Sequence, residues 1–410
     1  MLKHIDIKGY RSLKDVSLDM EPLNVLIGPN GGGKSNFMDV FALFKEAARG
    51  GLSEGIDRRG GIRSVCYRGG EVGLDFTLDF GSRELVAASG SVFAYAVSVR
   101  ARGTSPIVLT EEMWVPGWKP ENPDESDSDR LEVIEEMIMS RGGDTPGQVT
   151  MHFGPFFVPE ELLPAPHVIQ VQSESELAIF QIRNPTEYAR QYRLLQDLEN
   201  WAHYPPIDVS PQSGIRRPQT TRPGLRVFRK CENAVAVLNA IAQMRPDVWG
   251  ETLDVLRVAC PDLRDVRFPP QGGDGKVFLY WFEKPFESEA GFSPDDLSDG
   301  TVRLLALVAI LMTPEPPPLI CIDEPEIGLH PDWIKIVAEL LQSAATRTQV
   351  IVATHSPELV SRVKPSEVVV VEKEDGATVM ERLSEEDLAV WLDEFRLGDL
   401  WKSGHIGGRP

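Results

Sequence analysis

Alternating hydrophobic and polar positions at the start of the chain predict a layer of antiparallel β-strands. Residues 4–8 and 15–20 alternate in this way, and a glycine-containing turn at 9–12 lies between them. Strict alternation is typical of strands that bury only one face. Strand-like runs at 72–78 and 91–97 indicate that the β layer continues further along the chain.

A mainly apolar run, Leu-Asn-Val-Leu-Ile, follows at residues 23–27, as expected for a strand that is buried on both faces. It leads into the stretch Gly28-Pro-Asn-Gly-Gly-Gly-Lys-Ser35, which fits the pattern G-x-x-x-x-G-K-[ST]. Apolar residues then recur at helical spacing until Gly50 and Gly51 end the helix. A strand, a glycine loop and a helix turn backbone N–H groups inward and aim the positive helix end at phosphate. The stretch therefore predicts a nucleotide-binding site.

The residues of this loop have expected tasks in nucleotide binding. Lys34 would reach the β- and γ-phosphates, and the hydroxyl of Ser35 would ligate Mg²⁺. The expected nucleotide contacts are Gly28, Asn30, Gly31, Gly32, Gly33, Lys34, Ser35 and Asn36. Taken alone, such a loop suits a kinase, a GTPase or a motor, so the class of nucleotide machine depends on the rest of the chain.

A second set of motifs begins with Leu297-Ser-Asp-Gly-Thr301. The apolar run 302–312 predicts a buried helix that Pro314 ends. A serine and a glycine at a helix N-terminus offer an anion free N–H donors, a hydroxyl and the positive end of the helix dipole. An ordinary serine N-cap with a glycine turn gives the same pattern, so this stretch alone leaves both interpretations open.

Two further apolar strands end in polar residues. Residues 316–322 lead to Asp323, which can hold Mg²⁺, and to Glu324, which can orient and deprotonate the attacking water. The alternative is a strand that ends in a solvated acidic turn. Residues 349–354 lead to His355, which can contact the γ-phosphate, although a structural strand-end histidine gives the same pattern. The order and spacing of these residues after a phosphate loop favour the functional interpretation.

Composition restricts the class of protein. A chain of 410 residues exceeds an ordinary single domain, so we expect two lobes or a large insertion. No run approaches the ~18 apolar residues of a membrane span. The four cysteines (Cys66, Cys231, Cys260 and Cys321) lack C-x-x-C spacing, and the seven histidines form no metal-ligand cluster. We therefore expect reduced thiols, a cytoplasmic protein and no membrane partner.

The net charge of −20 argues against a protein that coats nucleic acid, but one basic segment stands apart. Residues 213–230 contain no acid, and their cations are Arg216, Arg217, Arg222, Arg226, Arg229 and Lys230. This segment can contact the phosphate backbone of DNA, or its arginines can pair with surface acids, and both interpretations stay open. Residues 119–137 have the opposite bias and predict a solvated acidic loop that runs into a helix.

The motifs at 28–35, 297–301 and 319–324, followed by His355, resemble those of the ABC-type ATPases. Three stretches resemble sequences of the RecF, SMC and OLD branch: Gly9-Tyr-Arg-Ser, Ile-Asp-Glu-Pro-Glu-Ile-Gly-Leu-His-Pro and Ala-Thr-His-Ser-Pro-Glu. They are similar to those of the compact bacterial AAA/ABC ATPases of abortive-infection and phage-defence loci. The resemblance implies an α/β P-loop NTPase fold. This would be an ABC-ATPase head with an antiparallel β layer, a mainly parallel core sheet flanked by helices, and a large inserted α/β lobe.

The same resemblance implies a homodimer that closes head to tail on two ATP molecules. The catalytic residues of one subunit would be Lys34, Glu324 and His355, with Ser35 and Asp323 at the Mg²⁺ ion. Leu297, Ser298, Asp299 and Gly300 of the other subunit would complete the site in trans. Arg11 would contact the nucleotide phosphates.

Some features depart from the family pattern. The family's signature motif corresponds to residues 297–301, and residues 298–301 read Ser-Asp-Gly-Thr, where transporters have Ser-Gly-Gly-Gln. A glutamine for the Q-loop cannot be chosen among Gln148, Gln170, Gln172 and Gln181. OLD nucleases carry a Toprim domain after the histidine motif, whereas only 55 residues follow His355 here, so we expect no intrinsic nuclease activity.

We expect residues 1–60 and 291–385 to form the ATPase head, 61–290 an inserted lobe with a helix at 184–204, and 386–410 a C-terminal helix and tail. The expected function is an ATP-hydrolysing switch in DNA transactions or phage defence, with a separate effector such as a nuclease as partner. One alternative is an ATP sensor or toxin component with slow hydrolysis and no DNA contact. The sequence of the signature motif and the lack of an identifiable Q-loop glutamine argue against a transporter subunit.

Overall fold

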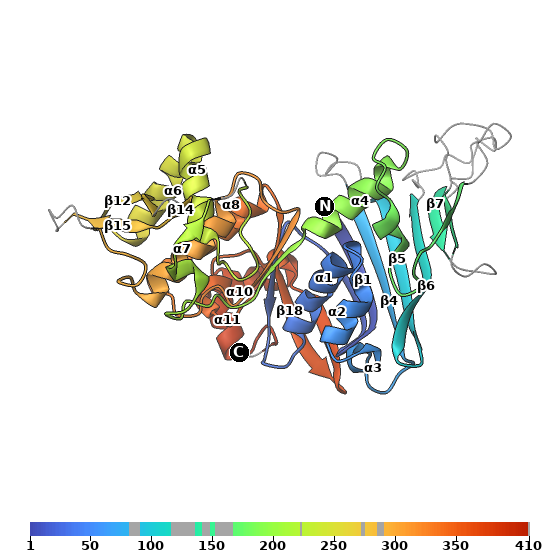
Figure 1. Ribbon diagram of the computed structural model, residues 1–410. Helices are drawn as coiled ribbons and strands as arrows, with labels where there is room; N and C mark the ends of the chain where they lie inside the picture. The colour runs from blue at the N-terminus through green and yellow to red at the C-terminus, as the bar shows by residue number, and fades with distance from the viewer. Residues whose placement is uncertain are drawn as a thin grey trace, which may run out of the picture. The chain divides into compact units, whose positions relative to one another are not determined.

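The computed structural model describes residues 1–81, 91–115, 136–141, 148–151, 167–221, 224–271, 275–284 and 291–408. The chain forms two compact units (Figure 1). The first comprises Met1–Met20, Asp39–Asn200 and Lys373–Met380, and the second comprises Glu21–Met38, Trp201–Glu372 and Glu381–Pro410. Arg222 and residues 119–135 of the acidic loop lie outside the described residues.

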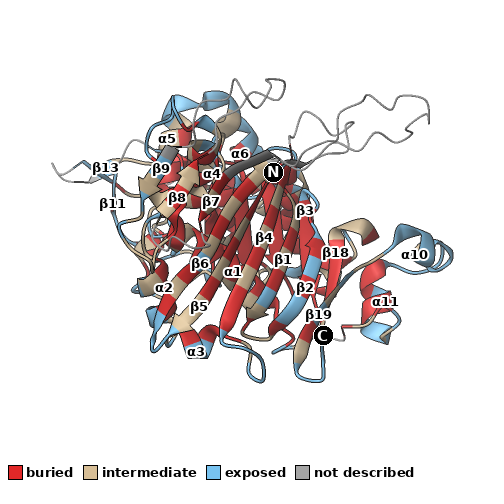
Figure 2. Cartoon of the chain, turned by 90° about the vertical axis from the view of Figure 1, so that its right-hand side faces the viewer, coloured by how far each residue is buried: buried red, intermediate tan, exposed pale blue. Residues whose placement is uncertain are grey.

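The first unit is built on an eight-stranded antiparallel sheet (Figure 2) with strand order β2-β1-β4-β5-β6-β7-β8-β9. Its strands are β1 (Leu2–Tyr10), β2 (Leu13–Asp19), β4 (Gly73–Gly81), β5 (Ser91–Arg102), β6 (Ser105–Val115), β7 (Glu136–Arg141), β8 (Gln148–Met151) and β9 (His167–Gln170). Every neighbouring pair is antiparallel, and Ile7 lies opposite Val16 in the first hairpin. The predicted antiparallel layer is therefore confirmed.

Helices cover one face of this sheet (Figure 1). They include α1 (Lys34–Ala48), which belongs to the first unit from Asp39 onward, α2 (Leu52–Arg58), α3 (Ile62–Val65) and α4 (Ala189–Asn200), with the 3₁₀ turn η2 (Ala178–Gln181). Phe44 of α1 packs edge-on against Phe76 of β4, with ring centroids 5.1 Å apart. Alternation along β4 thus places its apolar side chains under the helix.

A six-stranded sheet has the order β10-β16-β17-β3-β18-β19. Its strands belong to the second unit except for Lys373–Met380, which include the end of β18 and most of β19 and group with the first unit. The strands are β10 (Ala202–Tyr204), β16 (Leu319–Asp323), β17 (Gln349–Ala353), β3 (Leu23–Ile27), β18 (Val368–Glu374) and β19 (Ala377–Arg382). The first five run parallel to one another, so the expected mainly parallel sheet is present. β3 and β17 are buried along their whole length, as their mainly apolar sequences predict.

The remaining elements of the second unit pack on this sheet or beside it. Its helices are α5 (Ala234–Met244), α6 (Pro246–Ala259), α7 (Asp299–Leu311), α8 (Pro331–Ala345), α9 (Pro357–Val360), α10 (Glu385–Leu392) and α11 (Leu397–Ser403), with 3₁₀ turns η3 (Gly214–Arg216) and η4 (Pro365–Glu367). Short strands are β11 (Gln219–Thr220), β12 (Leu263–Arg267), β13 (Pro270–Gln271), β14 (Lys276–Val277) and β15 (Tyr280–Glu283). One apolar core joins α5, α7 and α8 to the parallel sheet.

One expectation from the sequence needs correction here. The helix expected at 184–204 ends at Asn200, and Ala202–Tyr204 instead pair in parallel with β16. Residues 61–200 group with the antiparallel sheet, whereas the chain from Trp201 onward, apart from Lys373–Met380, groups with the parallel sheet. The domain limits expected from the sequence, with an inserted lobe at 61–290, stay a prediction.

No helix in the described part of the chain is long and apolar enough to cross a membrane. All four cysteines are described, and none forms a disulfide.

Candidate nucleotide-binding site

The glycine loop joins the end of β3 to the start of α1 within the second unit. Gly28 has a φ of +145°, and a Cβ at this position would collide with the carbonyl group of Val371 on the neighbouring strand β18. Only glycine allows this approach of two backbones. The N–H of Phe37 donates to the carbonyl of Gly33 at 2.9 Å, which closes the first helical turn. The strand, loop and helix predicted from the sequence are all present.

Lys34 lies in the loop with its ammonium group folded back onto the backbone. Its Nζ donates to the carbonyls of Gly28 at 2.7 Å and Pro29 at 3.1 Å. Burial lowers the pKa of Lys34, and the nearby carboxylates of Asp323, Glu324 and Glu326 oppose that shift. The fold thus brings the predicted lysine and carboxylates together.

Asp323 and Glu324 stand at the carboxyl end of β16. Burial raises the pKa of Asp323 to about 6, with a further contribution from Glu324 and against the lowering effect of Lys34. Glu324 adopts a left-handed backbone conformation with φ +49°, and its N–H donates to the carbonyl of Ala353 at 2.8 Å. Such a conformation is costly for a residue with a side chain and concentrates at functional sites.

His355 follows β17 and faces Glu324. Its Nε2 lies 3.8 Å from Oε1 of Glu324. Burial lowers the pKa of His355, as does the positive charge of Lys34, against the effect of Glu324 and Glu326. The imidazole is therefore mostly neutral at pH 7, with one ring N–H available as a donor.

Glu326 is a member of this group that the sequence did not single out. Its Oε1 accepts hydrogen bonds from the Thr354 hydroxyl at 2.7 Å and from the backbone N–H of His355 at 2.6 Å. Its Oε2 is buried and has no hydrogen-bond partner among the described residues. Glu326 thus ties the loop after β16 to the loop after β17. The signal in the sequence is a third acid two positions after Glu324.

The signature stretch begins α7 as predicted. Ser298 is the N-cap residue, and its Oγ accepts from the N–H of Thr301 at 3.1 Å. Ser298 and Asp299 are exposed, whereas Leu297 and Gly300 are partly covered. A Cβ on Gly300 would approach the carbonyl oxygen of Gly328 to 2.9 Å, so glycine permits this close contact.

Arg216 does not lie on an exposed basic surface, which corrects the expectation for this residue. Only 5% of its side chain is exposed. Its guanidinium group donates to the carbonyls of Val209 (2.8 Å), Pro294 and Leu297 (3.2 Å) and to the carboxylate of Asp299 (2.6 Å). Because these contacts use its donors inside the protein, Arg216 is not available to DNA.

The other described cations of the basic segment are exposed. Arg217, Arg226, Arg229 and Lys230 are all solvent accessible, although Arg217 also donates to the carbonyl of Pro211 at 2.6 Å. The side chain of Asn233 holds the loop that carries the last three, because it bonds the backbone carbonyl of Arg226 and the N–H of Phe228. These residues remain a predicted contact surface.

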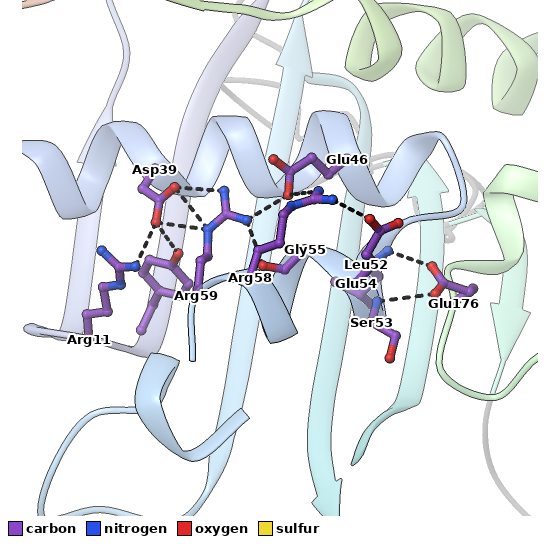
Figure 3. A network of polar contacts seen from close by, with 11 residues as sticks. Arg11, Asp39, Glu46, Leu52, Ser53, Glu54, Gly55, Arg58, Arg59 and Glu176 are labelled. Atoms are coloured by element: carbon purple, nitrogen blue, oxygen red, sulfur yellow. Dashed lines mark hydrogen bonds and ion pairs between the residues drawn. The ribbon is translucent and has the colours of Figure 1, made fainter. Parts of the chain in front are cut away.

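Arg11 lies in the first unit, where it takes part in a network of polar contacts (Figure 3). Its Nη2 is 3.3 Å from a carboxylate oxygen of Asp39, on the helix that begins at Lys34. Asp39 also accepts from Tyr10 at 2.7 Å and from Arg59 at 2.7 Å. The nucleotide contact expected for Arg11 stays a prediction. The four glutamines considered for the Q-loop also lie in the first unit.

The residues present suit a Mg²⁺ ion bound together with a nucleotide. Ser35 is exposed in the first turn of α1, and Asp323 offers a carboxylate near Lys34. Mg²⁺ prefers such hard oxygen ligands and completes its shell with water and phosphate oxygens. In the described residues no group of three or more His, Cys, Asp or Glu side chains could hold a metal, so this part of the chain offers no self-contained metal cage.

Two family models match the sequence. The model described as "AAA ATPase domain" matches residues 1–65, which contain the glycine loop. The model described as "AAA domain, putative AbiEii toxin, Type IV TA system" matches residues 169–361, which contain the signature, Asp323, Glu324 and His355. No curated protein matches the sequence.

Solved structures of SMC heads share the fold. The chain is similar to an SMC head bound to the C-terminal winged-helix domain of ScpA, with 14% identity, 94% of this chain and 99% of that chain covered, and a TM-score of 0.56. It is also similar to the SMC head with an extended coiled coil bound to the C-terminal domain of ScpA derived from Pyrococcus furiosus. Here the identity is 13%, 96% of this chain and 98% of that chain are covered, and the TM-score is 0.51. At these identities the likeness concerns the fold, which is the expected antiparallel layer with a mainly parallel sheet.

Proposed function

We propose that the chain is a P-loop ATPase of the ABC/SMC branch and that it works as an ATP-driven dimerisation switch. Two copies close head to tail on two ATP molecules, and hydrolysis releases them. The observation that carries this proposal is the grouping of Lys34, Asp323, Glu324 and His355 within one unit. The exposed Ser298 at the N-terminus of α7 supports it, because an exposed helix N-terminus can receive a phosphate held by a second copy.

ATP binding uses the donors of the glycine loop and the start of α1. The N–H groups that face the loop interior donate hydrogen bonds to the phosphate oxygens, and the positive helix end stabilises the phosphate charge. Lys34 exchanges its bonds to the carbonyls of Gly28 and Pro29 for bonds to the β- and γ-phosphates. This exchange satisfies a buried ammonium group with a charged partner instead of two neutral ones.

Hydrolysis uses the carboxylate and the imidazole that face each other. Glu324 orients the attacking water and accepts its proton, and the neutral His355 donates a hydrogen bond to the γ-phosphate. Ser35 and Asp323 are the residues that would hold Mg²⁺, which supplies charge neutralisation at the phosphates. Ser298 of the second copy contributes its hydroxyl to the same γ-phosphate.

For the biological role, we propose a defence or toxin system in which the dimer controls a separate effector. The family model named for a putative AbiEii toxin supports this role over general DNA repair. An effector such as a nuclease is the expected partner, with DNA as a further ligand of the exposed part of the basic segment.

Glu324→Gln is the variant that tests the proposed switch. It removes the proton acceptor but keeps the size of the side chain, so ATP should bind and remain uncleaved. We expect light scattering to show a monomer without nucleotide and a stable dimer with ATP and Mg²⁺. Glu315→Gln, an exposed acid before β16, is the matched control and should hydrolyse ATP like the wild type.

Two results would contradict the proposal. The first is a Glu324→Gln chain that hydrolyses ATP at the wild-type rate, because Glu324 would then not be the base. The second is full ATPase activity in a protein that stays monomeric at every concentration, because the site would then need no second copy.

A further inference from the structure

Arg216 connects a distant segment to the stretch that leads into α7. Two of its bonds reach the carbonyls of Pro294 and Leu297, and a third reaches the carboxylate of Asp299 at 2.6 Å. Its Nε donates to the carbonyl of Val209 at 2.8 Å, which fixes the guanidinium group from its other side. The arginine thus bridges residues 209 and 294–299 in a buried position.

The type of side chain suits this task. A guanidinium group carries five N–H donors in a rigid plane, so one arginine can serve three carbonyls and a carboxylate at once. A lysine at the same place has a single nitrogen at the end of a flexible chain and cannot satisfy acceptors spread in this way. The position therefore requires arginine for its geometry as well as its charge.

The contact with Asp299 also has an electrostatic consequence. Asp299 stands next to Ser298 at the helix N-terminus, and 68% of its side chain is exposed. A phosphate that approaches Ser298 would be repelled by this carboxylate. The guanidinium group of Arg216 balances the negative charge, which explains how an aspartate is tolerated in the signature.

We propose that Arg216 is a positioning residue that holds Ser298, Asp299 and Gly300 ready for the ATP bound by a second copy of the chain. It acts in trans, because it shapes the surface with which its own copy completes the partner's site. This inference rests on the proposed head-to-tail dimer.

The experiment mixes two defective full-length variants. Arg216→Ala should reduce kcat about a hundredfold through misplacement of the signature, while its affinity for ATP as a monomer should stay within about twofold of wild type. Lys34→Ala should be inactive because it cannot hold the phosphates. In a mixed dimer, the intact Lys34 of one copy meets the intact signature of the other. Half of the dimers in an equal mixture are mixed, and one of the two ATP sites in each mixed dimer is intact. The mixture should therefore regain activity at about a quarter of all ATP sites.

Matched controls separate this role from a general loss of folding. Arg257→Ala removes an exposed arginine of α6 that lies outside the site and should leave kcat unchanged. Arg216→Lys keeps the buried charge, so it carries the test if the alanine variant fails to bind ATP. It should also show a reduced kcat that the Lys34→Ala chain restores.

Three results would overturn the inference. They are wild-type activity in Arg216→Lys or Arg216→Ala, a mixture that regains no activity although Arg216→Ala binds ATP as expected, and an equal loss of kcat in Arg257→Ala. The proposed dimer is tested separately. If Glu324→Gln fails to dimerise with ATP, the proposed function is wrong; if it dimerises and the mixture regains nothing, only the role of Arg216 is wrong.

Discussion

The carboxylate of Glu326 accepts a 2.6 Å hydrogen bond from the backbone N–H of His355. The same oxygen accepts a bond from the hydroxyl of Thr354, whose Oγ1 in turn accepts from the N–H of Ser356 at 3.0 Å. The three residues that follow β17 are thus held from the loop that follows β16. A carboxylate outside the pair at 323–324 sets the position of the histidine.

We predict that Glu326→Ala will lower kcat and leave the KM for ATP nearly unchanged. Loss of the acceptor leaves the partly buried N–H of His355 unsatisfied, which costs about 1–3 kcal/mol, or roughly five- to 150-fold in rate if it appears in the transition state. Steady-state ATPase kinetics measure both constants. A rise in KM with an unchanged kcat would instead place Glu326 in ground-state ATP binding.

Glu326→Gln is the matched variant for this prediction. Its amide oxygen can keep both bonds made by Oε1, and its NH₂ group replaces Oε2, which has no partner among the described residues. Most of the activity should therefore return. Equal losses in the alanine and glutamine variants would show that the negative charge, rather than the hydrogen bonds, is what His355 requires.

The contacts of Asp39 lead to a prediction about stability in the first unit. Burial alone would raise the pKa of Asp39, but hydrogen bonds and charge from Arg59, with further contributions from Tyr10 and Arg11, hold that pKa below its usual value. Asp39→Asn should therefore reduce the free energy of unfolding at pH 7 by about 1–3 kcal/mol. Chemical denaturation followed by far-UV circular dichroism measures the change.

The pH dependence of this difference follows from the lowered pKa. A carboxyl group whose pKa is lower in the folded state stabilises the fold above its unfolded pKa of about 4. That contribution is lost as the pH falls through the folded pKa, so wild type and Asp39→Asn should converge in acid. Asp57→Asn, an exposed acid on α2, is the control and should be neutral throughout. A difference that does not change with pH would point to packing instead of charge.

The sequence predicted those parts of the molecule that local patterns determine. The glycine loop needs only the strand before it and the helix after it, and alternation alone identified β1 and β2. The local pattern predicts a helix at residues 202–204, but their structure depends on a distant partner: His203 pairs with Cys321 of β16. Tertiary pairing of this kind overrides local propensity.

Side-chain contacts across long stretches of sequence explain the remaining differences. Arg216 was grouped with its basic neighbours, but its acceptors Pro294, Leu297 and Asp299 lie about eighty residues away. Nothing near Arg216 in the sequence distinguishes it from Arg217, which is exposed. The role of Glu326 likewise depends on Thr354 and His355, which only the parallel pairing of β16 with β17 brings close.

The burial of Arg216 changes how DNA binding should be tested. A variant that reverses its charge would disturb the signature, so a loss of binding would say nothing about a DNA surface. The suitable residues are Arg226, Arg229 and Lys230, which are exposed on a loop fixed by Asn233. If they contact phosphates, reversing all three to glutamate should weaken DNA binding and leave ATP-dependent dimerisation intact.

The salt dependence of binding tests this last prediction most sharply. Each phosphate contact releases counterions and adds about 0.9 to the slope of log K against log salt concentration, so the triple variant should lose roughly 2–3 from that slope. A triple reversal of Arg245, Arg257 and Arg267 changes the net charge equally, but these arginines already pair with aspartates. Its slope should stay closer to that of the wild type. Equal losses in both variants would mean that overall charge, and not this loop, governs DNA binding. Unchanged binding in the first variant would assign these cations to protein contacts instead.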